Sequence, residues 1–108
     1  MEYDYRAWQA QIDGLLTKDW DVFATLKFAD GFQLKPKAAH QILRTTWNMM
    51  DRTFFGRLGV ERGVRIQRYG VLHMGQSGKN LHFHCVAQSI GDCTQFCDLL
   101  RATWCNGF

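Results

Sequence analysis

The segment His73-Met74-Gly75-Gln76-Ser77-Gly78-Lys79-Asn80-Leu81-His82-Phe83-His84 places three histidines on the two sides of a glycine-containing turn. After the turn, apolar residues occupy every second position, and the positions between them hold His82, His84, Val86 and Gln88. A period of two is typical of a strand that buries one face. We therefore expect a β-hairpin with strands over 64–74 and 80–88, and with both histidines of the second strand on the face that leaves the core.

The same hairpin predicts a metal site. Histidines at i and i+2 of a strand share a face, and antiparallel pairing can place His73 on that face beside His82 and His84. Imidazole nitrogens bind divalent ions, and three of them leave coordination positions open for a substrate. The fourth histidine, His40, is expected to be an ordinary surface residue of a helix.

Hydrophobic periodicity outside the hairpin predicts one more strand and three helices. The strand covers about 21–28, and the helices cover about 4–18, 36–55 and 92–104, with glycines marking a loop after the second helix. The expected order is α-β-α-β-β-α. This order indicates an α+β fold with a ferredoxin-like or RRM-like antiparallel sheet and helices on one face, and residues 1–108 form a single domain.

Composition agrees with one folded domain of modest positive charge. The chain has 108 residues, 46% of them hydrophobic, and a formal net charge of +3. No segment approaches the roughly 20 consecutive apolar residues of a membrane-spanning helix. The four cysteines form no CxxC pair, so a reduced intracellular compartment is expected. Cys93 and Cys97 have a spacing compatible with zinc, but packing as small hydrophobic side chains is the favoured interpretation.

Basic, polar and aromatic residues near the histidines predict contacts with a phosphate-bearing ligand. We expect the basic residues of the hairpin region to gather around the metal site and to hold phosphates, while aromatic rings stack unpaired bases. The candidate ligand-binding residues are Phe23, Thr25, Lys27, Arg65, Gln67, Arg68, Tyr69 and Lys79.

Two motifs in this order resemble those of the HUH endonucleases. Phe23-Ala24-Thr25-Leu26-Lys27-Phe28, a long helix and Leu81-His82-Phe83-His84-Cys85-Val86 are similar to the first two motifs of that superfamily, which includes rolling-circle replication initiators. The resemblance implies that Mn²⁺ or Mg²⁺ binds to His82 and His84 with a third polar ligand, a place that His73 matches.

The resemblance also implies an activity. In that family a tyrosine nicks single-stranded or hairpin origin DNA through a 5′-phosphotyrosyl intermediate, and the reverse step rejoins the strand. Such a protein would act in the cytoplasm in a plasmid or phage context, or in the host compartment where viral DNA replicates. Replication, transposition and conjugation all use this chemistry, and the sequence leaves the choice and the oligomeric state open.

The nucleophile departs from the pattern of replication initiators, in which the tyrosine follows the histidine motif. No tyrosine follows Tyr69 in this chain. We expect the chain to be an N-terminal fragment whose tyrosine lies beyond Phe108. Relaxases carry theirs near the N-terminus, which makes Tyr3 and Tyr5 the other candidates, although Tyr5 fits the apolar side of the first helix.

Three alternatives remain at this point. A domain without a usable tyrosine could bind single-stranded nucleic acid without cutting it. A single-tyrosine transposase or relaxase would share the enzymatic chemistry. A small-molecule metalloenzyme of the cupin or histidine-triad type is disfavoured by the long helix from Pro36 to Phe55 and by the residues after His84, which include no further histidine.

Overall fold

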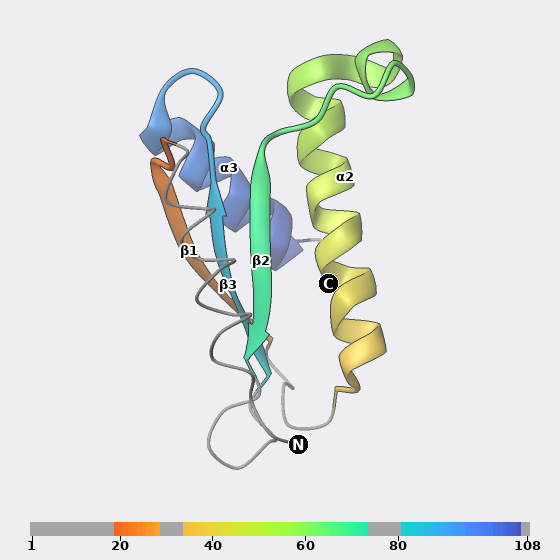
Figure 1. The fold of residues 1–108 in the computed structure, drawn as a ribbon, viewed down its shortest axis with the longest axis vertical. Helices are drawn as coiled ribbons and strands as arrows, with labels where there is room; N and C mark the ends of the chain where they lie inside the picture. The colour runs from red at the N-terminus through yellow and green to blue at the C-terminus, as the bar shows by residue number, and fades with distance from the viewer. Residues whose placement is uncertain (1–18, 29–33, 74–80, 107–108) are drawn as a thin grey trace.

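The computed structural model describes residues 19–28, 34–73 and 81–106, with side chains up to residue 104 (Figure 1). The elements in order are β1 (Val22–Lys27), α2 (Pro36–Glu61), β2 (Arg68–His73), β3 (His82–Ala87) and α3 (Cys93–Asn106). The predicted α+β class is confirmed. The helix expected over 4–18 lies outside the described residues, so the order that the structure describes is β-α-β-β-α.

The three strands form one antiparallel sheet in the order β1-β3-β2. Strand β3 lies in the centre and pairs antiparallel with both neighbours, so β1 and β2 run parallel to each other and α2 connects them. This arrangement matches the first five of the six elements in a ferredoxin-like β-α-β-β-α-β fold. The central strand is the one that carries His82 and His84, and the paired strands hold their backbone on both sides.

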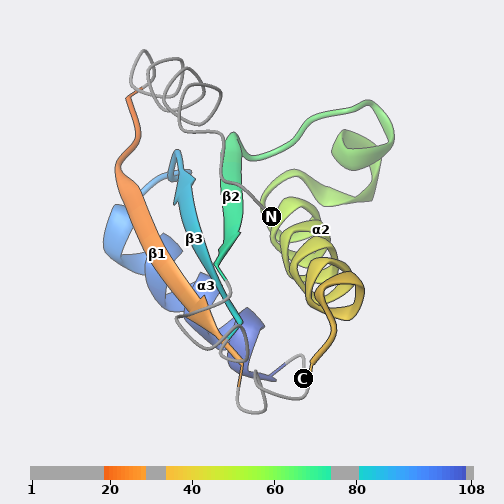
Figure 2. The same cartoon turned by 60° about the horizontal axis from the view of Figure 1, so that its bottom comes forward.

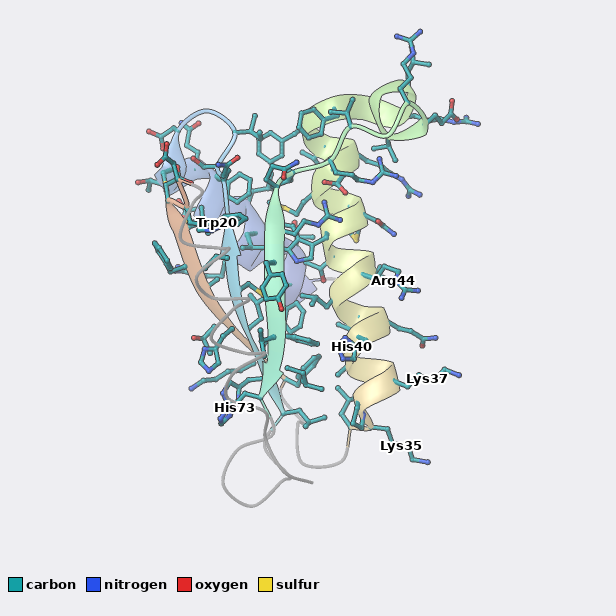
Figure 3. All side chains as sticks on the ribbon, viewed as in Figure 1. Trp20, Lys35, Lys37, His40, Arg44 and His73 are labelled. Atoms are coloured by element: carbon teal, nitrogen blue, oxygen red, sulfur yellow. The ribbon has the colours of Figure 1, made fainter. Side chains whose placement is uncertain are left out.

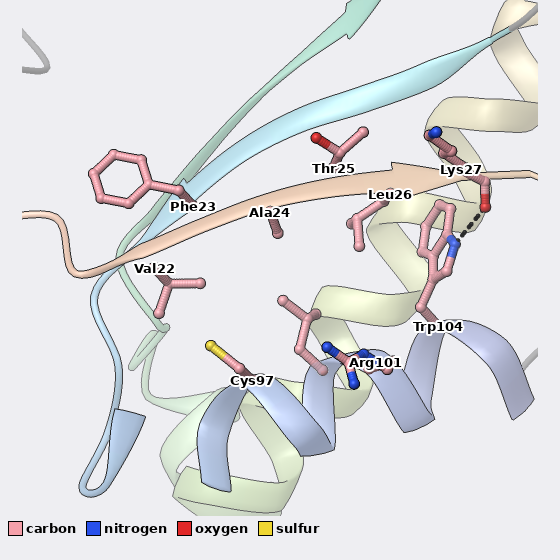
Figure 4. A pocket seen from close by; sticks show the side chains of 10 residues that line it. Val22, Phe23, Ala24, Thr25, Leu26, Lys27, Cys97, Arg101 and Trp104 are labelled. Carbon is pink, nitrogen blue, oxygen red and sulfur yellow. Dashed lines mark hydrogen bonds between the residues drawn. The ribbon is translucent and has the colours of Figure 1, made fainter. Parts of the chain in front are cut away.

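Both helices pack against the same face of the sheet (Figures 1 and 2). Phe83, at the centre of that face, is fully buried, and Trp47 of α2 and Phe96 of α3 belong to the same core. The indole Nε1–H of Trp104 donates a hydrogen bond of 2.7 Å to the carbonyl oxygen of Lys27 (Figure 4). This bond fastens α3 to the end of β1.

Helix α2 is longer than its periodicity predicted. The loop expected after Phe55 begins only at Arg62, because the helix continues to Glu61 through a bend at Gly56. Gly56 has φ 69° and ψ 173°, a left-handed backbone conformation that glycine tolerates and other residues rarely adopt. Figure 1 shows the last turns of α2 leaving the direction of the main helix.

Strand β2 is shorter than predicted because the backbone before it bonds to α2. The Val64 N–H donates to the Gly59 carbonyl oxygen and the Ile66 N–H donates to Asp51 Oδ1, both at 2.9 Å. These groups therefore do not join the sheet ladder, and β2 begins only at Arg68.

Cys85 lies in the core, and Cys93 and Cys97 pack partly buried against it. Cys85, Cys93 and Cys97 are free, and burial raises the pKa of the Cys85 thiol to about 12. Cys85 therefore packs as a neutral, small hydrophobic side chain. Among the helices that the structure describes, none has the length and apolar character needed to cross a membrane.

Candidate metal centre

The three histidines of the hairpin meet on the face of the sheet opposite α2 and α3, which is open with respect to these two described helices. His73 of β2 lies directly opposite His82 of β3, and His84 follows two residues later on the same face. One ring nitrogen from each histidine can be chosen so that all three lie within 4.8 Å of one another. The predicted convergence of these side chains is therefore confirmed, and the cluster could hold a metal ion.

Strand alternation explains why the rings meet there. Leu81, Phe83 and Cys85 point into the core, so the residues between them must point to the opposite side. The Nε2 atoms of His82 and His84 are 3.2 Å apart, and the ring centroids of His73 and His82 are separated by 4.8 Å. Because His73 and His84 are exposed and His82 is half-buried, a bound ion would remain open to a substrate from the solvent side.

Thr25 of β1 orients one of these rings. It lies opposite His84 in the register, and its Oγ1 is 3.4 Å from Nδ1 of His84. When the Nδ1–H of His84 donates to this hydroxyl oxygen, the lone pair of Nε2 is free and faces Nε2 of His82. In this tautomer Thr25 orients the ring of His84 so that its Nε2 can act as a ligand.

We predict that Thr25→Val lowers the affinity for Mn²⁺ by about tenfold, because groups that orient a ligand typically contribute factors of 10 to 100. Thr25→Ser keeps the hydroxyl and should bind Mn²⁺ like the wild type. Isothermal titration calorimetry measures both affinities. The prediction fails if the valine variant retains wild-type affinity while its thermal unfolding is unchanged.

The pKa of His84 lies below the ordinary histidine value of 6.5. Loss of hydration is the largest cause, followed by repulsion from His82 and His73. A lowered pKa keeps the imidazole neutral at pH 7, which is the form that binds a metal. The folded state therefore resists protonation at His84 more than the unfolded state does.

A pH dependence follows from this direction. Below about pH 6.5 the unfolded chain binds more protons at His84 than the folded chain, so stability should decrease as the pH falls further. We expect the unfolding temperature of the metal-free protein to drop between about pH 7 and pH 5, and to drop less in His84→Gln. Equal slopes for the two proteins in differential scanning calorimetry would contradict this expectation.

The open face of the sheet is a grid of three rows across β1, β3 and β2. The register places Lys27, His82 and His73 in the first row, Thr25, His84 and Val71 in the second, and Phe23, Val86 and Tyr69 in the third. The structure thus brings the candidates of β1, together with Tyr69, onto the face of the histidines. Phe23 is 75% exposed, which is unusual for a large apolar ring and leaves its surface available.

Arg65 and Arg68, the predicted basic residues at and just before the start of β2, lie away from the histidines. Arg68 is five residues from His73, which corresponds to about 17 Å along a strand. Its Nη1 donates to Asp51 Oδ1 at 2.8 Å, and its guanidinium lies 5.4 Å from the ring centre of Trp47. Arg65 Nε is 3.6 Å from the same carboxylate. The expected gathering of these arginines around the histidines is wrong, because a buried acid holds them at the other end of β2.

Three further candidates take other positions. The Gln67 carbonyl oxygen accepts a hydrogen bond of 2.9 Å from the Gln88 N–H, next to the start of β2. Lys79 and both N-terminal tyrosines, Tyr3 and Tyr5, lie outside the described residues.

Sequence reasoning missed Asp51. It is fully buried and accepts hydrogen bonds from the Ile66 N–H and from Arg68. A signal was present: Asp51 is the only acidic residue between Pro36 and Phe55, and it lies four residues after Trp47, on the inward side of the helix. An acid at such a position predicts a buried partner, although not which one.

The three histidine rings also contact one another. The His82 and His84 rings meet edge to face at 4.8 Å, and those of His73 and His84 are 5.7 Å apart. Such spacing is compatible with nitrogens directed at one ion.

Comparisons of this chain with models of protein families, with curated proteins and with solved structures find no match.

Proposed function

We propose that this domain binds single-stranded DNA on the open face of its sheet and uses a metal ion to nick and rejoin the strand. The observation that carries the proposal is the convergence of His73, His82 and His84 on an exposed face that also presents aromatic rings. The proposed biological setting is the initiation of rolling-circle replication. Transposition and conjugation would use the same reaction.

The donor set favours Mn²⁺ over Mg²⁺. Three imidazole nitrogens suit a transition metal, whereas Mg²⁺ prefers oxygen ligands. When bound, such an ion supplies positive charge that polarises a phosphate oxygen. His73, His82 and His84 would hold it, and Thr25 would keep His84 in the productive orientation.

The remaining residues of the grid would position the DNA strand. Lys27 is directly opposite His82, so its ammonium group can contact a phosphate next to the metal site. Phe23, Val86 and Tyr69 form a row two residues, or about 7 Å, beyond the row of His84, where unpaired bases can stack. Phosphate chemistry and base contacts would thus occupy adjacent parts of one surface.

The nucleophile would come from outside the described residues. Tyr69 lies on strand β2, one row from His84 on the open face, whereas the resemblance implies a nucleophile on a helix after the histidine motif. We propose a tyrosine beyond Phe108, with Tyr3 and Tyr5 as the other candidates. Its oxygen would form a bond to phosphorus as the bond to the 3′ oxygen breaks, which gives a 5′-phosphotyrosine and a free 3′-OH.

A non-catalytic binding module is the second candidate function. The observation that favours it is the place of Tyr69, the only tyrosine among the described residues, on a strand and not on a helix after the histidine motif. Such a module would use the same open face for single-stranded nucleic acid but would form no covalent intermediate.

A search for a covalent adduct separates the two functions. The protein is incubated with labelled single-stranded DNA, including hairpin substrates, in Mn²⁺ or in EDTA, and is then analysed on a denaturing gel. We expect a Mn²⁺-dependent protein–DNA adduct, with the modified tyrosine located by peptide mass spectrometry. DNA binding without an adduct or a cleavage product in Mn²⁺ would reject the nickase and support the binding module.

A further inference from the structure

A second concave site lies around the edge of the sheet from the histidines. It is a groove of about 320 Å³ between α2 and the outer side of β2. Its polar lining comes from His40, Arg44 and Arg68, and Trp47 and Tyr69 contribute aromatic surface. Neither the metal site nor the predicted DNA contacts of β1 account for this groove.

The groove is positively charged because acids are missing from the helix beside it. From Pro36 to Met50, α2 contains Lys37, His40 and Arg44 but no acidic residue. The next acid, Asp51, is buried and carries one negative charge against the two positive charges of Arg65 and Arg68. The balance at the groove is therefore positive even after the ion pairs are counted.

The charged residues follow the strand that leads to the metal site. Figure 3 shows Lys37, His40 and Arg44 along the first half of α2 and Lys35 just before it, at the end of the helix that lies level with His73. Exposed Arg44 lines the groove itself. The basic residues of α2 therefore extend from the groove toward the end of the helix that lies level with His73.

Tyr69 connects the two surfaces. It belongs to the apolar row of the open face, opposite Val86, and it also lines the groove. A strand that stacks a base in this row would reach the outer edge of β2 at Tyr69, directly beside the guanidinium-lined groove. Its next phosphates would then lie within reach of Arg44.

We propose that this groove binds the phosphodiester backbone of the single strand whose bases lie on the open face, after the strand passes over the edge of β2. The inference rests on the proposed function, because it assumes that the open face binds DNA. It adds a second contact region, which recognises phosphate charge and not base identity.

Binding measurements without metal test the groove separately from catalysis. Fluorescence anisotropy in EDTA compares an oligonucleotide of about twelve nucleotides with one of about four, which is too short to cover both surfaces. The variant is Arg44→Ala. Arg52→Ala is the matched control, because Arg52 is an exposed arginine of the same helix that does not line this groove.

We expect Arg44→Ala to weaken binding of the longer oligonucleotide about tenfold and to reduce the slope of log K against log salt by about 0.7, the value for one phosphate contact on a single strand. The shorter oligonucleotide should bind to the Arg44→Ala variant with the same affinity as to the wild type. Arg52→Ala should change neither affinity by more than about twofold. Unchanged thermal unfolding of both variants verifies that each is folded.

The outcomes separate this inference from the proposed function. Equal effects of Arg44→Ala and Arg52→Ala on affinity, or an equal loss of affinity for both oligonucleotide lengths, would overturn the proposal that the groove binds DNA. The proposed metal site would not be affected by either result. A wild-type protein that binds no single-stranded DNA would overturn both proposals. Selective weakening by Arg44→Ala in a protein that forms no adduct would support the groove and reject only the nickase.

Discussion

Replacing His84 with alanine is expected to lower the affinity for Mn²⁺ by more than about 100-fold and to abolish the proposed metal-dependent cleavage of DNA. The ligand set contains three imidazoles, and His84 faces His82 with an Nε2 to Nε2 distance of 3.2 Å. Its removal leaves two nitrogens, which hold a divalent ion too weakly to compete with water. His82→Ala should have the same effect, because His82 lies between the other two rings on the sheet.

Structural damage does not explain such a loss, because His84 is exposed. Its replacement should change the free energy of unfolding by less than about 0.5 kcal/mol at neutral pH. His40→Ala is the matched control, since His40 is an exposed histidine outside the cluster. Calorimetric titration with Mn²⁺ should find wild-type affinity for this control. If His84→Ala binds Mn²⁺ as tightly as His40→Ala does, the three histidines are not the metal site.

The sequence predicted the sheet and the histidine cluster because a single local rule governs both. In β3, apolar Phe83 and Cys85 alternate with His82 and His84, and the core can accept only one of these faces. Once the hairpin forms, the parity of His73 places it on the face of the other two. Strand periodicity and an antiparallel turn are therefore sufficient to predict the histidine cluster.

The predicted positions of Arg65 and Arg68 were wrong because these side chains contact Asp51, and no local sequence pattern encodes that contact. Arg68 is close to His73 in the sequence, but a strand extends by about 3.4 Å per residue and separates them. Its partner Asp51 belongs to a different element, 17 residues away. Charge alone therefore predicted a phosphate contact where the fold contains a buried ion pair.

The bend in α2 was missed for a related reason. Glycine is typical of loops, and the sequence therefore predicted a loop at Gly56. Its left-handed φ of 69° instead only changes the direction of the helix, whose turns continue to Glu61. That continuation carries the chain to Val64, whose N–H bonds back to Gly59. The sequence indicated where the direction changes but not that helical structure resumes.

The buried ion pair leads to the second large effect. Asp51→Ala is expected to lower the free energy of unfolding by about 3 kcal/mol, the usual cost of removing one partner from a buried pair. The change leaves the buried Ile66 N–H without its acceptor and Arg68 without its carboxylate. About 3 kcal/mol is a large part of the stability of a domain of this size. Urea unfolding followed by circular dichroism measures the difference.

Two further variants show whether burial of the charge causes the loss. Asp51→Asn keeps the shape and one acceptor oxygen, so it should lose less stability than the alanine variant. Arg57→Ala removes an exposed pair with Glu61 and should cost less than about 1 kcal/mol. If Asp51→Ala is no less stable than Arg57→Ala, Asp51 does not anchor β2 to α2.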